Sequence, residues 1–110
     1  MIDETVSKLE AQLREAGNLA PGRKDELLRL LGTLKAEVAE LSKTNREDAQ
    51  SIARFTEVSA LEATRVEQNP KLRELSLAGL RSSVEGFEES HPKLVQAVNS
   101  ISQTLSNLGI

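Results

Sequence analysis

The sequence of 110 residues contains no cysteine, which excludes disulfides and thiolate chemistry. Tyrosine and tryptophan are also absent, and Phe55 and Phe87 are the only aromatic residues. Two phenylalanines cannot build the base-stacking platform of a single-strand binder, and the aromatic and β-branched enrichment of strands is missing. A chain without cysteine is compatible with a reducing compartment, so we expect a cytoplasmic protein.

Long apolar runs are missing as well. No stretch of 18 consecutive apolar residues occurs, so we expect no membrane-spanning segment. The first four residues have neither the basic nor the apolar character of a secretory signal. Net charge is −3 with both signs interspersed, so neither an anionic membrane nor nucleic acid is expected as a partner.

Strong helix formers dominate what is present, chiefly Leu, Glu, Ala, Lys and Arg. Charged residues make up 28% and hydrophobic residues 38%, a balance typical of folded chains. The sequence therefore predicts an all-α fold: an antiparallel helical bundle or hairpin with coiled-coil character. We expect one domain over residues 1–110, with helices at about 3–16, 23–68, 70–89 and 92–108.

Three stretches carry apolar residues at alternating steps of four and three, which is the spacing of one helix face. Leu34 lies in the middle of the second stripe, so Leu34→Ala should destabilise strongly, whereas the same change at the adjacent Lys35 should matter little. The stripes are Ile2, Val6, Leu9, Leu13 and Ala16; Leu27, Leu31, Leu34, Val38 and Leu41; and Leu94, Val98, Ile101, Leu105 and Leu108.

The middle of the chain allows two interpretations. Neither glycine nor proline occurs between positions 33 and 69, which favours one long central helix of about 45 residues, roughly 68 Å in length. The alternative is two helices joined near position 44, because Thr44 to Glu47 fits a capping box. Further on, Asn69-Pro70 and His91-Pro92 are typical of helix starts.

Catalytic, cofactor and metal sites are not expected. The chain has no nucleophile elbow and no glycine-rich phosphate loop. His91 is the only histidine, and with Glu88 and Glu89 alone it cannot surround a metal ion, so we interpret it as a structural residue before Pro92. We therefore expect a protein without enzymatic activity.

Two surfaces are candidate interfaces. No charged side chain occurs from Leu94 onward, which is unusual for a solvated helix in a charge-rich protein, and a partner could cover the polar face there. Glycine weakens a helix interior, so a neighbouring stripe of small residues indicates close approach by another backbone. The alternatives are ordinary neutral surface in the first case and packing within the chain in the second. The candidates are Gln96, Asn99, Ser100, Gln103 and Asn107, and Ser76, Gly79, Ser83 and Gly86.

The segment from Phe87 to Leu94, with its Ser-His-Pro core, resembles the ending of a bacterial family of short helical proteins, a domain of unknown function. The final residues, Leu105 to Ile110 with Asn-Leu-Gly-Ile, resemble it too, as do the first helix and the start at Asp25. Residues 43–69 are more helical than the connector that the resemblance implies. The family implies a small bacterial helical protein and assigns no activity.

Function is therefore expected to lie in association. The leading hypothesis is a structural or adaptor protein that acts through helix–helix contacts, as a homo-oligomer or with an unknown protein partner. The alternative is a regulatory module that binds a specific macromolecule, such as a toxin-neutralising or DNA-associated protein.

Overall fold

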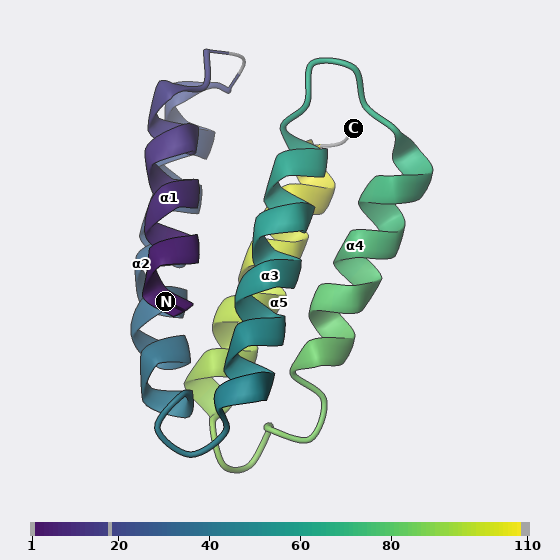
Figure 1. Ribbon diagram of the computed structural model, residues 1–110. Coiled ribbons are helices and arrows are strands. Elements are labelled where there is room, and N and C mark those ends of the chain that lie inside the picture. The colour runs from purple at the N-terminus through teal and green to yellow at the C-terminus, as the bar shows by residue number, and fades with distance from the viewer. Residues whose placement is uncertain (1, 18, 109–110) are drawn as a thin grey trace.

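The computed structural model describes residues 2–17 and 19–108, and the backbone there is helical with short connections (Figure 1). The predicted all-α class is confirmed for these residues, which contain no strand. Asn18 and the Gly109-Ile110 ending of the resemblance motif lie outside the described residues. The helices in chain order are α1 (Ile2–Glu15), α2 (Pro21–Leu41), α3 (Arg46–Ala63), α4 (Pro70–Ser83) and α5 (Pro92–Leu108).

The prediction of one long central helix is wrong. The chain turns after α2, so that α3 runs back antiparallel to it, and the molecule measures only 37 Å along its longest axis (Figure 1). The backbone N–H of Asn45 donates to the carbonyl of Leu41 at 2.8 Å and closes the turn. A continuous helix would place Asn45 and Asp48 on its apolar seam, whereas the turn allows Leu41 and Ala49 to be buried together.

The capping box that suggested a break near position 44 does not form as expected. Asn45, not Thr44, is the N-cap residue, and it makes no side-chain capping bond. The Thr44 hydroxyl donates back to the carbonyl of Leu41 at 3.4 Å. The break therefore lies where the alternative placed it, but burial of the flanking helices explains it better than capping does.

α3 is the central helix of the bundle, with α1 and α4 on either side and α2 and α5 also in contact (Figure 1). Its buried face is built almost entirely from small residues, which lets these neighbours approach closely. This face consists of Ala49, Ile52, Ala53, Thr56, Ser59, Ala60 and Ala63.

The core follows the three predicted stripes. Leu34 is fully buried, as expected, and the side chain of Ile2 lies outside what the structure describes. Lys35 differs from its expectation, because its Nζ lies 2.8 Å from Oε1 of the buried Glu10 and joins α2 to α1. Buried stripe residues are Val6, Leu9, Leu13, Leu27, Leu31, Leu34, Val38, Leu41, Leu94, Val98, Ile101 and Leu105.

The helix predicted for residues 70–89 starts as expected and ends early. The Asn69 side chain accepts a hydrogen bond from the backbone N–H of Leu72 at 3.2 Å, which caps α4. α4 ends at Ser83, six residues before the predicted end, and Gly86 follows with a φ of +96° that glycine adopts without strain. Pro92 then starts α5, and the carbonyl of His91 accepts the N–H of Val95 at 3.2 Å.

Candidate association surface

The outer face of α3 carries large apolar side chains although its inner face is made of small ones. Phe55, Val58 and Leu61 are spaced three residues apart and expose 40%, 45% and 39% of their surface. Folded proteins usually bury side chains of this size. The arrangement of large and small residues on α3 is therefore the reverse of that on an ordinary core helix.

α4 continues this apolar face beside α3. Leu72 and Leu75 expose 44% and 59% of their surface. The ring of Phe55 lies against Gly79, where an added Cβ would be 2.6 Å from Cδ1 of the ring. This contact places Phe55 and Gly79 at the same level of the antiparallel pair. We call these five side chains the α3–α4 surface.

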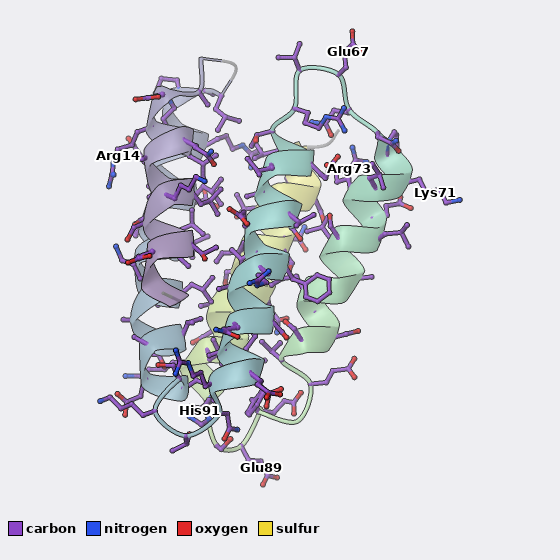
Figure 2. The ribbon with its side chains drawn as sticks, viewed as in Figure 1. Arg14, Glu67, Lys71, Arg73, Glu89 and His91 are labelled. Atoms are coloured by element: carbon purple, nitrogen blue, oxygen red, sulfur yellow. The ribbon has the colours of Figure 1, made fainter. Side chains whose placement is uncertain are left out.

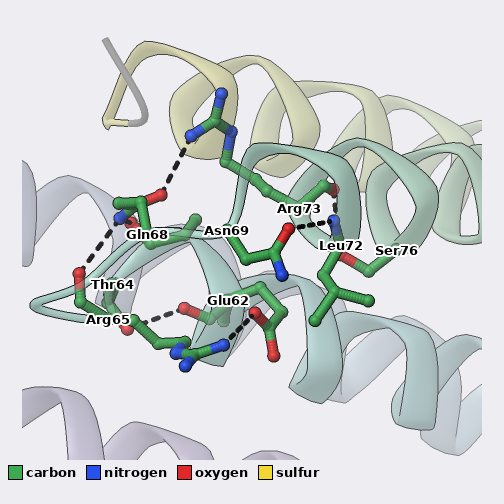
Figure 3. Close-up of polar contacts among 10 residues, drawn as sticks. Glu62, Thr64, Arg65, Gln68, Asn69, Leu72, Arg73 and Ser76 are labelled. Atoms are coloured by element: carbon green, nitrogen blue, oxygen red, sulfur yellow. Dashed lines mark hydrogen bonds and ion pairs between the residues drawn. The ribbon is translucent and has the colours of Figure 1, made fainter.

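The turn between α3 and α4 is held by a polar network that fixes the upper end of this surface (Figure 3). The amide of Gln68 donates to the carbonyls of Ala63 at 2.7 Å and Arg65 at 3.2 Å, and its Oε1 accepts from Arg73 at 2.9 Å. The guanidinium of Arg65 lies 3.0 Å from the carboxylate of Glu62. These bonds tie the end of α3 to the start of α4.

A hollow of about 410 Å³ extends the surface at its lower end, towards the α4–α5 connection. Phe55 and Phe87 line it, together with serine hydroxyls and the carboxylates of Asp48 and Glu85. At the upper end, Lys71 extends outward from the start of α4 and Glu67 from the α3–α4 connection (Figure 2). The upper end thus carries charged side chains of both signs.

The polar face predicted on α5 is exposed and largely open. Gln96, Asn99, Gln103 and Asn107 are exposed, and Ser100 is half-buried. The amide of Gln103 donates to Oδ1 of Asn107 at 3.2 Å, and an open hollow of about 540 Å³ lies beside this face. Water can hydrogen-bond these amides, so the geometry does not require a partner there.

The small-residue stripe is not one continuous surface. Ser76 is buried, and its hydroxyl donates to the carbonyl of Arg73 at 2.9 Å. Gly79 is covered by Phe55 of the same chain. Ser83 is half-buried at the end of α4, and Gly86 lies in the following turn instead of on the predicted helix.

The histidine and carboxylate side chains of the described part of the chain do not gather into a metal site. No group of three or more His, Asp or Glu side chains is placed there to hold a metal ion. The Nδ1 of His91 lies 3.0 Å from the hydroxyl of Ser90, and its ring packs edge-on against Phe87. Within residues 2–17 and 19–108, no helix combines the length and apolar composition that crossing a bilayer requires.

Sequence reasoning missed all five residues of the α3–α4 surface. Continuing the spacing of the Leu27–Leu41 stripe along the chain places Phe55 on one face with Ile52 and Ser59, both of which are buried. The small residues of α3 could have indicated this surface. A helix that buries alanine and serine can leave its larger apolar side chains exposed to solvent. Three large residues at steps of three, next to an alanine-rich face, would have indicated this surface.

Comparison with known proteins finds one family. A family model described as "Domain of unknown function (DUF4404)" matches residues 27–110. The match includes residues 43–69, the region expected to depart from the resemblance, and it begins within α2, so the first helix lies outside it. No curated protein and no solved structure matches the chain.

Proposed function

Since the chain belongs to the DUF4404 family, a domain of unknown function, we propose from its own surface that it is a non-catalytic structural or adaptor protein. It acts by helix–helix association through the α3–α4 surface, with side chains packed in the manner of a coiled coil. The proposal keeps the expected bacterial and cytoplasmic setting.

The observation that carries this proposal is the cluster of five large apolar side chains exposed on two adjacent helices. Their exposed fractions amount to roughly 400 Å² of apolar surface, taking about 200 Å² for each side chain when fully exposed. The largest apolar patch on a typical monomer measures about 300–600 Å², and such a patch is often functional. Val66 in the α3–α4 turn, 88% exposed, adds to this area.

The energetics favour a partner with a similar apolar surface. Removing roughly 400 Å² from water contributes about 10 kcal/mol, which is comparable to the cost of association. Net binding therefore requires the partner to bury an apolar area of its own. A helical face of similar composition meets this requirement, whereas a charged macromolecule such as nucleic acid does not.

Site-specific photo-crosslinking tests the proposal. A photoreactive phenylalanine analogue is introduced at position 75, on the α3–α4 surface, and separately at position 36, an exposed alanine on α2. In cells that produce the protein, we expect a crosslinked adduct from position 75 and none from position 36. Equal yields from both positions, or no adduct from position 75, would rule out this surface.

A further inference from the structure

We propose that α1 is a lid that opens as one unit while α2 to α5 stay folded. Opening exposes the apolar side of α2 that α1 covers in the closed structure. This lid is a different part of the molecule from the α3–α4 surface, and it opens whether or not that surface has a partner.

The contacts among the helices separate α1 from the rest of the bundle. Within the described residues, α1 contacts only α2 and α3, whereas α5 contacts α2, α3 and α4 (Figure 1). The hydroxyl of Thr104 also donates to the carboxylate of Glu26 at 2.9 Å and joins α5 to α2. The helices α2 to α5 are therefore held together by contacts in which α1 takes no part.

Few side chains attach α1 to the bundle. Its buried apolar side chains among the described residues are Val6, Leu9 and Leu13. Beside them, the carboxylate of Glu10 accepts a hydrogen bond from Lys35 of α2 at 2.8 Å. An isolated helix of 14 residues is only marginally stable in water, so these contacts keep α1 folded as well as bound. Their loss therefore releases and unfolds α1 in one step.

The side of α2 that α1 covers is apolar between two lysines. Lys24 donates to the carbonyl of Arg14 at 3.1 Å, and Lys35 also reaches α1. Leu28 and Leu31 lie on the same side, because positions 24, 28, 31 and 35 are four, three and four residues apart. Leu31 is fully buried, and Leu28 is partly buried against the core. Opening of α1 exposes these two leucines to solvent.

The boundary between α1 and α3 is packed less closely. A hollow of about 370 Å³ lies there, and the residues that line it include Glu4 and Lys8 of α1 and Arg54 and Glu57 of α3. Water can hydrate these charged side chains in the closed and in the open state. This part of the boundary therefore does little to keep the lid closed.

The connection to α2 allows α1 to open without disturbing the start of α2. Pro21 begins α2, and its fixed φ suits the first turn of a helix. The backbone N–H of Lys24 donates to the carbonyl of Ala20 at 3.0 Å, so the first turn closes on the connection and not on α1. At Gly17, an added Cβ would meet nothing within 4 Å, so the space around this residue is open.

Native-state hydrogen exchange of the full chain, read at single amides by NMR, tests the lid. In the natural sequence, amides in the middle of α1 should be at least about tenfold less protected than those of α5. Ile101 is fully buried on α5, which does not contact α1. Ile101→Val should speed exchange in α5 about threefold to tenfold. It should leave exchange in α1 unchanged, because Ile101 stays buried while the lid is open.

The matched change on the lid is Leu9→Ala. It should speed exchange in α1 about thirtyfold or more, and in α5 as well, since the contacts of Leu9 are lost both in lid opening and in complete unfolding. An Ile101→Val variant that speeds α1 and α5 by the same factor would show that α1 opens only when the whole chain unfolds, and would overturn the inference. Equal protection of α1 and α5 in the natural sequence would overturn it too.

Discussion

Replacement of Lys35 by methionine should loosen the attachment of α1 to α2. Lys35 is 2.8 Å from the carboxylate of Glu10, and the two side chains are 36% and 8% exposed. At that distance the gross attraction is about 6 kcal/mol for an effective dielectric constant of about 20. Desolvation of Glu10 offsets much of this, and solvent at Lys35 screens the remainder. We expect Lys35→Met to cost about 1–3 kcal/mol, because it leaves a buried carboxylate without its cation.

Urea unfolding followed by circular dichroism measures this loss, and an exposed ion pair supplies the matched control. Lys43 lies 3.0 Å from Glu40, but these side chains are 70% and 64% exposed, so Lys43→Met should cost less than about 0.5 kcal/mol. Adding Glu10→Leu to Lys35→Met removes the buried charge and should restore most of the stability. Equal losses for Lys35→Met and Lys43→Met would refute the reasoning.

Three further changes have distinct expected outcomes. Leu34→Ala should cost about 2–5 kcal/mol in urea unfolding, since the side chain is fully buried, and a loss under 1 kcal/mol would contradict its place in the core. Ser59→Ala should raise stability by up to about 1 kcal/mol, because the buried hydroxyl has no hydrogen-bond partner among the described residues; a clear loss would point to a bound water. Gln103→Glu should leave stability within about 0.5 kcal/mol and the oligomer mass unchanged, whereas a change in mass would move the interface to α5.

Helix periodicity predicted the parts of the fold in which one apolar stripe faces one core. The leucines of α2 and the apolar residues of α5 are buried as their spacing indicated. The break between Leu41 and Arg46 could not be read in the same way, because no glycine or proline marks it. The helix ends there because packing α2 and α3 side by side buries more apolar surface than one extended helix could, and this depends on tertiary contacts.

The α3–α4 surface could not be predicted from the sequence either, because its position also depends on tertiary contacts. Hydrophobic periodicity identifies which residues share a face, but not which of two faces turns inward. In α3 the small residues around Ala53 and Ala60 face the core, since neighbouring helices crowd it, and the larger Phe55 and Val58 remain outside. The polar face of α5 was predicted as a candidate interface because it carries no charge, but water readily hydrates an uncharged polar face.

Light scattering at tens of micromolar tests the association surface most directly, with the natural sequence, Leu75→Glu and Ala36→Glu compared side by side. Leu75 is 59% exposed, so a glutamate there should leave the monomer folded, and circular dichroism verifies this. We expect twice the chain mass of 12.0 kDa for the natural sequence and for Ala36→Glu, and the single chain mass for Leu75→Glu. A natural sequence that scatters as a monomer, or a Leu75→Glu variant that remains a dimer, would contradict self-association through the α3–α4 surface.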